Sequence, residues 1–251
     1  MKYFILTGAS KGLGEGIALA LIDPGHHIIC IARTANQTLQ KLAKARDCRL
    51  DFVSFDLFHT QDIPSLMGKV FDQIDQKQAS GIFLINNAGV IHPVARVEDC
   101  PADQTERHMR INLLAPMLLC AAFIEKTLKV QAMKRILNIS SGAAQNPYYG
   151  WSNYCTGKAG LDMFGRCIAE EQRDEQWPVQ TMAVAPGIID TEMQTAIRNT
   201  DDRAFIHRKK FIELKETGKL ISPAIAGKAL VKLLLSDDFK DGEVTDIRDS
   251  Y

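Results

Sequence analysis

The stretch Thr7-Gly8-Ala9-Ser10-Lys11-Gly12-Leu13-Gly14 stands between an apolar run at 3–7 and a run with helical spacing at 13–22. Glycines at this spacing permit a tight turn that a ligand can approach closely. The N–H groups that open the following helix would then point at a pyrophosphate. The stretch therefore predicts a dinucleotide-binding turn. Its G-x-x-x-G-x-G spacing differs from the more familiar G-x-G-x-x-G, and a glycine-rich turn without a ligand is the alternative.

Outward from this turn, short apolar and β-branched runs alternate with longer amphipathic stretches. This alternation predicts a parallel sheet with helices on both faces, because parallel strands need crossover connections. We therefore expect an α/β fold of the doubly wound Rossmann type, with three layers and a seven-stranded parallel sheet. The expected strands are 3–7, 28–32, 50–55, 82–85, 135–139, 179–184 and 243–247, and the expected helices include 13–22, 61–76, 104–127, 154–175 and 223–235.

The sequence contains no obvious boundary between domains. No Pro/Gly/Ser-rich linker, repeat or low-complexity tract divides the 251 residues, so we expect a single domain spanning 1–251. The least regular portion, 186–222, contains two charged helical pieces and is long enough to cover a site. We expect a substrate lid at 187–221.

Composition and charge exclude several classes of partner. Thirty Lys and Arg balance thirty Asp and Glu, so no net field would attract nucleic acid or an anionic membrane. The longest apolar run, 113–124, is interrupted by Pro116 and is shorter than the roughly 18 residues of a membrane span. Met1-Lys2 leads directly into the first expected strand, without room for a signal peptide. The six cysteines show no C-x-x-C pair or metal-ligand spacing, which favours a reduced, cytoplasmic setting without a metal.

The end of the second expected strand indicates which dinucleotide is bound. An acidic residue there would bond the ribose 2′-hydroxyl of NAD, but this chain has Ala32-Arg33. An arginine can pair with a 2′-phosphate in bidentate geometry and stack beside adenine, and Lys11 adds positive charge. We therefore expect NADPH or NADP+ as the cofactor. The alternative is that Arg33 and Lys11 are ordinary surface cations.

A tyrosine and a lysine are the catalytic candidates. Tyr154 and Lys158 are four residues apart in an expected helix, so their side chains share one face. A nearby ammonium stabilises a phenolate and would lower the pKa of Tyr154 from its usual value of about 10. The hydroxyl would then exchange a proton with a substrate oxygen. Tyr148 and Tyr149 lack a lysine at this spacing.

A second hydroxyl lies at the end of the fifth expected strand, in Asn138-Ile139-Ser140-Ser141-Gly142. The carboxyl ends of parallel strands are where such sheets bind ligands. We expect Ser141 to hold the oxygen of a reacting carbonyl group. The alternative is that its hydroxyl bonds the backbone where the strand ends.

Together these motifs resemble the short-chain dehydrogenase/reductases, over essentially the whole chain. Their joint occurrence in this order is more specific than any one of them. The resemblance is carried by 7–14, Asn86-Asn87-Ala88-Gly89, Asn112, Ser141, Tyr154, Lys158 and 186–191. Within the family, the segments 141–155, 158–163, 185–194 and 214–220 look like sepiapterin reductases and (S)-benzoin-forming benzil reductases.

The resemblance implies a proton relay of four residues. Tyr154 would donate the proton to the carbonyl oxygen, and Ser141 would orient that oxygen. Lys158 would hold the nicotinamide ribose and lower the pKa of the tyrosine. Asn112 would hold a water that links Lys158 to solvent. As a residue type alone, Asn112 is a polar residue at a helix bend, for which a structural role is the alternative.

The resemblance also implies cofactor contacts along the chain. Asp56 would accept from the adenine amino group, Ala88-Gly89 would let the adenosine ribose approach, and Thr191 would bond the nicotinamide carboxamide. As a residue type, Asp56 is also a common cap. Asn86 and Asn87 are expected to brace the sheet. The full expected set is Gly8, Ser10, Lys11, Gly12, Leu13, Gly14, Ala32, Arg33, Asp56, Leu57, Asn87, Ala88, Gly89, Tyr154, Lys158, Pro186, Gly187, Ile189, Thr191 and Met193.

Apolar and aromatic side chains before Tyr154 and in the lid favour an apolar or aromatic carbonyl substrate. Packing of these rings against the rest of the fold is the alternative. They are Tyr148, Tyr149, Trp151, Met193 and Phe205.

Asp246 matches an aspartate that anchors the pterin in sepiapterin reductases. The match lies in a short tail where Ile247-Arg248 replaces two aromatic residues. The expected substrate-binding residues are therefore Ser141, Tyr148, Trp151, Tyr154 and Asp246.

These expectations combine into an NADPH-dependent carbonyl reductase that transfers hydride to a ketone or a benzil-like vicinal diketone. A sepiapterin-type pterin reductase is the alternative enzyme. An NADP-sensing regulator is the non-enzymatic alternative, against which the intact Ser141, Tyr154 and Lys158 argue. Family members associate through two long central helices, here 104–127 and 154–175, so we expect a homodimer or homotetramer.

Overall fold

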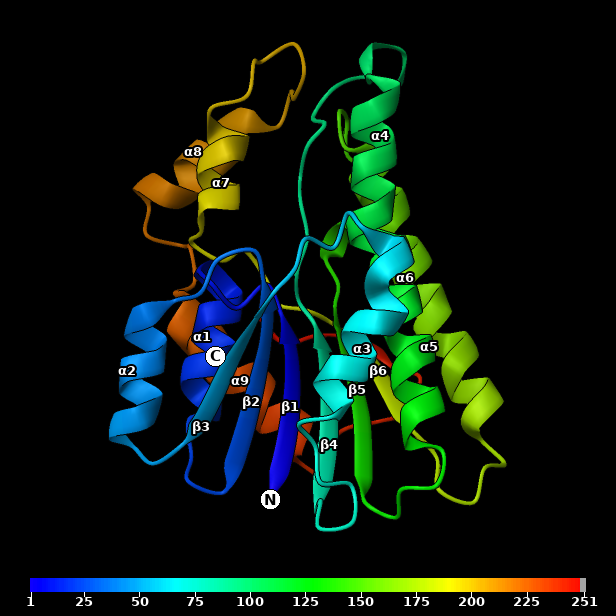
Figure 1. The fold of residues 1–251 in the computed structure, drawn as a ribbon. Helices are drawn as coiled ribbons and strands as arrows, with labels where there is room; N and C mark the ends of the chain where they lie inside the picture. The colour runs from blue at the N-terminus through cyan, green and yellow to red at the C-terminus, as the bar shows by residue number, and fades with distance from the viewer. Residues whose placement is uncertain (249–251) are drawn as a thin grey trace.

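The computed structural model describes residues 1–248, so the last three residues of the expected domain 1–251 lie outside the described part. One sheet of seven strands runs through it in the order β3-β2-β1-β4-β5-β6-β7 (Figure 1). All neighbouring strands are parallel. Because β1 lies between β2 and β4, the chain reverses direction across the sheet at this point, and the predicted doubly wound α/β fold is confirmed.

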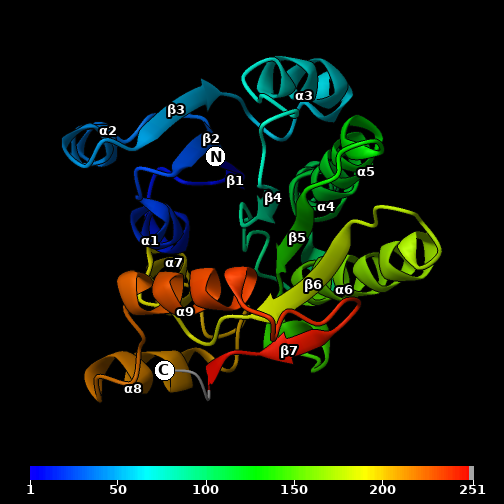
Figure 2. The ribbon, with the colours of Figure 1, turned by 90° about the horizontal axis from the view of Figure 1, so that it is seen from below.

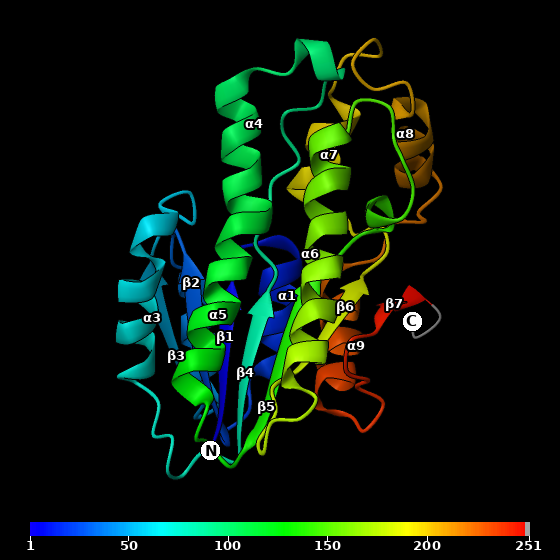
Figure 3. The ribbon, with the colours of Figure 1, turned by 90° about the vertical axis from the view of Figure 1, so that its right-hand side faces the viewer.

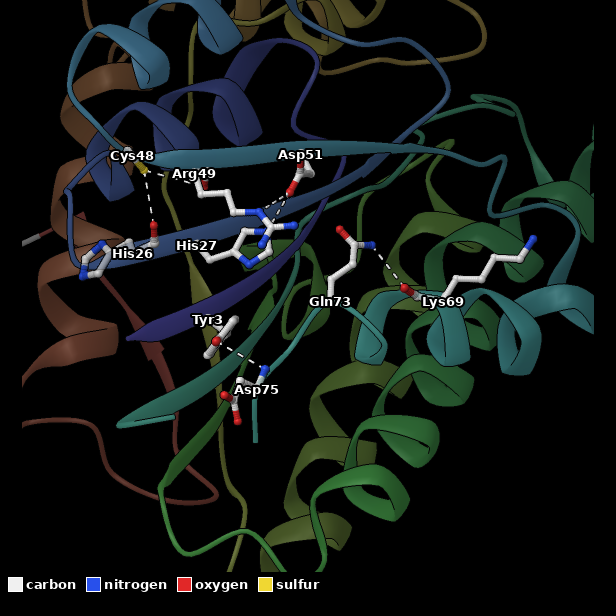
Figure 4. A network of polar contacts seen from close by, with 9 residues as sticks. All are labelled: Tyr3, His26, His27, Cys48, Arg49, Asp51, Lys69, Gln73 and Asp75. Carbon is white, nitrogen blue, oxygen red and sulfur yellow. Dashed lines mark hydrogen bonds and ion pairs between the residues drawn. The ribbon is translucent and has the colours of Figure 1, made fainter. Parts of the chain in front are cut away.

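The strands begin and end within two residues of their predicted bounds. They are β1 (Lys2–Thr7), β2 (His26–Ala32), β3 (Arg49–Ser54), β4 (Gly81–Asn86), β5 (Met133–Ile139), β6 (Gln180–Ala185) and β7 (Val244–Asp246). β2 starts earlier than its apolar run suggested because His26 and His27 extend it. His27 is buried, and its Nε2 lies 2.8 Å from Asp51 Oδ2 on β3 (Figure 4).

Helices cover both faces of the sheet, as predicted (Figure 2). On one face lie α1 (Gly12–Leu21), α2 (Gln37–Ala45) and α9 (Pro223–Leu235), and on the other lie α3 (Ile63–Phe71), α5 (Ala115–Thr127) and α6 (Ser152–Gln172). Glycines let α1 and α9 approach closely, because a Cβ on Gly16 would lie 2.0 Å from the Pro223 oxygen. Each face buries its own apolar core, so the sheet forms a rigid platform.

The helix expected at 104–127 is confirmed as one continuous stretch that begins two residues earlier. α4 (Ala102–Met109), a π-helical turn η3 (Arg110–Leu114) and α5 follow one another without a break. By length and composition alone, this 26-residue stretch would pass for a membrane span. Of its most apolar window, 44% is buried inside the protein, and core helices of other proteins can pass the same test.

The segment 187–221 lies beyond the carboxyl ends of the strands (Figure 1). It contains α7 (Glu192–Arg198) and α8 (Arg208–Glu216), which are the two charged helical pieces predicted there. Ile189 and Ile221 form an isolated parallel bridge that joins the two ends of the segment. Three short turns, η1 (Thr60–Asp62), η2 (Val97–Asp99) and η4 (Gly142–Ala144), complete the described elements.

Candidate active site

The glycine-rich turn has the backbone that its sequence predicts. Gly8 and Gly12 have φ angles of 73° and 60°, a left-handed conformation that glycine adopts most readily. A Cβ on Gly14 would lie 2.1 Å from the Gly8 oxygen, so α1 packs against the turn without room for a side chain. The turn is therefore a cradle of bare backbone at the N-terminus of α1, as a pyrophosphate requires.

Polar side chains tie this turn to the end of β4. Thr7 Oγ1 accepts hydrogen bonds from the N–H groups of Asn87 and Ala88, each at 3.0 Å. Asn87 Nδ2 donates to the Thr7 oxygen at 2.9 Å. Asn86 Nδ2 donates to Asn138 Oδ1 on β5 at 2.9 Å. Both asparagines thus brace the framework around the turn, in keeping with the role expected for them.

The ends of β2 and β3 place a cation beside a carboxylate. Ala32 is buried, Arg33 is exposed, and Asp56 lies where the chain leaves β3. Burial acts to raise the pKa of Asp56, but the Phe58 N–H and the charges of Arg107 and Arg33 outweigh it and lower the pKa. Asp56 is therefore a carboxylate that already accepts from Arg107 at 3.3 Å. Sequence reasoning missed Arg107, which comes from α4, 51 residues further along the chain.

Lys11 was predicted to add positive charge near a cofactor phosphate, but in the structure it already has a partner. Its ammonium pairs with Glu192 at the start of α7, and both side chains are exposed. Thr191 lies close by, because a Cβ on Gly12 would lie 3.2 Å from Thr191 Cγ2. The start of the 187–221 segment thus lies against the glycine turn. Lys11 therefore lies near the predicted phosphate site with its charge partly balanced by Glu192.

The three central candidates converge at the carboxyl edge of β5. Tyr154 and Lys158 lie on α6 and are 8% and 4% exposed. Lys158 Nζ lies 5.9 Å from the centre of the Tyr154 ring and donates to the Ile139 oxygen at 2.6 Å. Ser141 follows β5, accepts from the Ala143 N–H at 3.2 Å and also interacts with the Tyr154 hydroxyl. The structure therefore brings together one phenol, one ammonium and one hydroxyl.

The pKa of Tyr154 does not move as its spacing from Lys158 predicts. Burial raises it, and the hydrogen bond with Ser141 opposes the increase without overcoming it. Burial also lowers the pKa of Lys158 to about 8, against the opposing charge of Asp162. The expectation of a lowered tyrosine pKa is therefore wrong for this structure. Spacing in sequence reports the nearby charge but not the loss of water around both groups.

Asp162 extends this face of α6 by a further turn and was missed in the sequence. It is 7% exposed, and burial raises its pKa while Ser140 and the charge of Lys158 act to lower it. Tyr154, Lys158 and Asp162 are spaced four residues apart, so the repeat itself was visible in the sequence. Asp162 is the carboxylate that counters the buried ammonium.

Asn112 lies in the π-helical turn η3, and its amide is held from two sides. Its Oδ1 accepts from the Val90 N–H at 2.8 Å, and its Nδ2 donates to the Val90 oxygen at 2.7 Å. The same Nδ2 lies 2.8 Å from His108 Nε2. A Cβ on Gly89 would lie 3.3 Å from Asn112 Oδ1 and 3.9 Å from Lys158 Nζ. Protein atoms thus accept from both hydrogens of the Asn112 amide. The water expected on Asn112 must therefore donate to its side-chain oxygen or to its backbone oxygen.

His108 is a further residue that sequence reasoning missed. It is fully buried on α4, and its ring meets that of Tyr154 edge to face at a centroid distance of 6.1 Å. Its position four residues before Asn112 was visible in the sequence. Its backbone partner, the oxygen of His92, lies outside the helix and was not predictable from that spacing.

Most of the aromatic side chains expected near the substrate are packed into the fold, whereas Tyr149 is 39% exposed. Trp151 is 5% exposed and stacks on Phe205 at a centroid distance of 4.6 Å, while Tyr148 lies 5.0 Å from Trp151. Met193 packs against the same cluster. The rings thus hold the 187–221 segment against the loop before α6. Little of the Trp151 surface remains for the substrate contact predicted for it.

Asp246 ends β7, and its carboxylate is occupied by its own chain. Its Oδ1 accepts from the Arg248 backbone N–H at 3.0 Å and from Arg248 Nε at 2.9 Å. Arg248 also lies beside Gly187, since a Cβ there would lie 3.0 Å from Arg248 Cγ. The arginine that replaces an aromatic residue thus neutralises the expected anchor for a pterin.

The fold and these motifs together define a class of protein. Residues 2–202 match the family model described as short chain dehydrogenase, and the chain belongs to this family of oxidoreductases. It is 42% identical over 244 residues to a benzil reductase ((S)-benzoin forming) of Bacillus cereus, covering 97% of this chain and 98% of that protein. It is 30% identical over 257 residues to a sepiapterin reductase of Xenopus laevis, covering 98% and 95%. A solved short chain dehydrogenase/reductase of Saccharomyces cerevisiae superposes with a TM-score of 0.84 at 26% identity, covering 99% and 97%.

Proposed function

We propose that the protein is an NADPH-dependent carbonyl reductase that acts on a ketone or a benzil-like vicinal diketone. The convergence of Tyr154, Lys158 and Ser141 at the carboxyl edge of the sheet carries this proposal. The glycine turn ends at the same edge, so a dinucleotide bound there would place its reactive end near the phenol. The name of the Bacillus cereus relative supports the choice of substrate class.

Residues of the site fit a phosphorylated dinucleotide. The bare backbone between Gly8 and Gly14 would hold the pyrophosphate, and the exposed Arg33 would pair with the 2′-phosphate. Asp56 and Leu57 would contact the adenine, and Thr191 the carboxamide. The remaining expected contacts are Ser10, Lys11, Gly12, Leu13, Ala32, Asn87, Ala88, Gly89, Pro186, Gly187, Ile189 and Met193.

The chain's own residues would supply and steer the proton. A bound NADPH supplies the hydride. Because burial raises its pKa, Tyr154 stays protonated near neutral pH and is ready to donate to the carbonyl oxygen. Ser141 would hold that oxygen, and the ammonium of Lys158 would stabilise the phenolate that forms. Asn112 would hold the water that returns a proton through Lys158.

The alternative of a pterin reductase requires a free carboxylate at Asp246. Arg248 donates to this carboxylate twice and so competes with a guanidine-like ligand edge. This contact favours an apolar diketone over a pterin. Ser141, Tyr148 and Tyr154 remain the proposed substrate contacts, and Trp151 would add only the small part of its surface that its packing leaves exposed. The third alternative, an NADP-sensing regulator, leaves the buried tyrosine and lysine without a use.

We also propose that 187–221 acts as a lid and that the protein is a homodimer or homotetramer in the cytoplasm. The bridge between Ile189 and Ile221 supplies a fixed base for the lid.

α5 and α6 lie side by side on the outside of the molecule (Figure 3). An apolar surface cavity of about 320 Å³ lies along the continuous helix from α4 to α5 and is lined by Glu106, Met109, Arg110, Leu113, Leu114 and Met117. All six cysteines are free, which fits a reducing compartment.

A substrate panel tests the proposal. NADPH consumption is followed with benzil, with an alkyl phenyl diketone and with sepiapterin, and NADH is run in parallel. We expect turnover of the diketones, little turnover of sepiapterin and a preference for NADPH. Turnover of sepiapterin alone would support the pterin reductase instead. NADPH binding without turnover of any carbonyl compound would support the regulator.

A further inference from the structure

The hydrogen bonds around His108 fix which of its nitrogens carries a proton. Nδ1 lies 2.8 Å from the His92 oxygen, and a carbonyl oxygen only accepts. Nδ1 must therefore donate. Nε2 faces Asn112 Nδ2 at 2.8 Å, so one of these two atoms must be an acceptor.

Val90 decides which of the two accepts. Its N–H and its oxygen face Asn112 Oδ1 and Nδ2, at 2.8 Å and 2.7 Å. The reversed amide would bring oxygen against oxygen and N–H against N–H. Asn112 Nδ2 is therefore the donor, and His108 Nε2 accepts with its lone pair. Only the neutral imidazole with its hydrogen on Nδ1 satisfies every contact.

The place of His108 links this hydrogen bond to the catalytic face of α6. A Cβ on Gly157 would lie 3.6 Å from His108 Nε2 and 3.4 Å from Asn112 Cβ. Gly157 stands between Tyr154 and Lys158, so His108 and Asn112 lie directly against the segment of α6 that joins the catalytic pair. The His108 ring also packs edge to face on Tyr154.

We propose that His108 is a positioning residue for the reduction. Its neutral imidazole holds the Asn112 amide, and Asn112 in turn holds the Val90 backbone and the neighbouring Gly89 against Lys158. This inference rests on the proposed function, because it assigns a role within the same site. It predicts that activity needs a hydrogen-bond acceptor at the position of Nε2.

Protonation would reverse the contact. A hydrogen on Nε2 would point at the Asn112 amide hydrogens, so the hydrogen bond would become a repulsion. The titratable groups of α6 that face His108 are Tyr154 and Lys158. The arginines of α4 and η3, Arg107 and Arg110, lie over the ring of Phe58 and not over His108. Burial and the charge of Lys158 lower the pKa of His108, and the bond to His92 opposes them. Activity is therefore expected to fall on acidification as this imidazole gains its proton.

Two variants and one control test the proposal. His108→Gln retains an acceptor near the Nε2 position but does not titrate, and His108→Phe retains the ring against Tyr154 without either nitrogen. His27→Gln, at the other buried histidine far along the sheet, is the control. We would measure kcat and KM for NADPH and for the carbonyl substrate from about pH 5 to about pH 8, together with thermal unfolding.

We expect His108→Phe to lower kcat by roughly 10- to 100-fold with little change in KM for NADPH. His108→Gln should recover most of kcat and lose the acid-side fall, and His27→Gln should leave kcat unchanged. A wild-type kcat in His108→Phe, an equal loss in both His108 variants, or an unchanged acid-side fall in His108→Gln would each overturn the proposal.

Long-range proton–nitrogen NMR of the histidines gives a readout that needs no turnover. In the unliganded protein we expect His108 to carry its hydrogen on Nδ1, and Asn112→Ala to shift the Nε2 resonance. A hydrogen on Nε2 would overturn the proposal even if the reductase activity is present. If no carbonyl compound is reduced, the proposed function fails, while the spectrum still reports on the hydrogen bond.

Discussion

Two buried histidines in this molecule both have a lowered pKa, but the hydrogen-bond partners of their ring nitrogens differ. His27 on β2 and His108 on α4 are both at most 1% exposed, and burial lowers the pKa of each. His27 Nε2 faces the carboxylate of Asp51, which also accepts from Arg49 (Figure 4). His108 Nε2 faces the amide N–H group of Asn112. His27 therefore donates from Nε2, whereas His108 accepts there.

The difference lies in what a proton would do. If His27 gains a proton, its contact with Asp51 becomes an ion pair and is kept. If His108 gains one, its contact with Asn112 is lost, and the nearby ammonium of Lys158 adds repulsion. A lowered pKa alone thus says little about function. The partner of the ring nitrogen decides whether the surrounding site depends on the charge state.

Tyr154→Phe is expected to have the largest effect, on the active-site side of this comparison. It removes the hydroxyl that would donate the proton, and general acid catalysis contributes about 10²- to 10⁴-fold. We expect kcat to fall by that order while NADPH affinity, measured by fluorescence titration, stays within about two-fold, a change of less than about 0.5 kcal/mol. His27→Phe, which also alters a buried ring, serves as the control and should retain kcat. Unchanged turnover in Tyr154→Phe would remove the phenol from the mechanism.

Arg33→Asp should have the next largest effect, on cofactor choice. The variant replaces a cation that would pair with the 2′-phosphate by an anion that suits a ribose hydroxyl. Loss of a charge-assisted contact of about 1.5–3 kcal/mol should weaken NADPH binding by roughly 10- to 100-fold and favour NADH. The ratio of kcat/KM for NADPH and NADH checks this expectation. Equal use of both cofactors by the unmodified protein would contradict it.

Asp162→Asn is expected to move the alkaline limb of the pH profile. Burial lowers the pKa of Lys158 to about 8, and the Asp162 carboxylate opposes that shift. Without the carboxylate the pKa of Lys158 should fall further, so kcat/KM should begin to decline at a lower pH than in the wild type. Above this point the loss should approach about ten-fold per pH unit. If kcat/KM of the variant declines at the same alkaline pH as in the wild type, the pKa of Lys158 does not determine that decline.

The sequence could predict the local features of this molecule but not those that depend on how distant segments pack. The turn from Gly8 to Gly14 and the helical and strand spacings of the apolar residues are local properties, so the strand bounds were predictable to within two residues. The helix expected at 61–76 is shorter, because α3 ends at Phe71. Tyr154 and Lys158 were identifiable because one helix face carries both. The pKa of Tyr154 was predicted in the wrong direction, because it depends on how much water the fold excludes.

Contacts between distant segments were the other limit. Lys11 meets Glu192 across 181 residues, and no local pattern couples the glycine turn to the start of α7. Arg248 and Asp246 are only two residues apart, but their pairing depends on how the chain turns after β7 so that the Arg248 N–H also reaches Asp246 Oδ1. For His108 the spacing to Asn112 was visible, while the proton position follows from the backbones of His92 and Val90 in a separate loop.

His27→Leu should have the smallest effect, and it tests the histidine that lies away from the active site. The variant removes the bond to Asp51, whose carboxylate is 41% exposed and stays hydrated and paired with Arg49. Only the net value of one hydrogen bond is lost, so the free energy of unfolding at pH 7 should fall by about 1 kcal/mol. The midpoint of thermal unfolding should drop by about 2–4 °C, and kcat should not change.

Acidification should then reduce the difference between the two proteins. Because the folded-state pKa of His27 is lowered, the unfolded chain binds the additional proton first, and wild-type stability falls as the pH drops below about 6.5. His27→Leu lacks this term, so its deficit measured by chemical denaturation should be smaller near pH 5 than near pH 7. A deficit that grows on acidification would mean that Asp51 raises the pKa of His27 more than burial lowers it, and the pKa directions of the two histidines would no longer match.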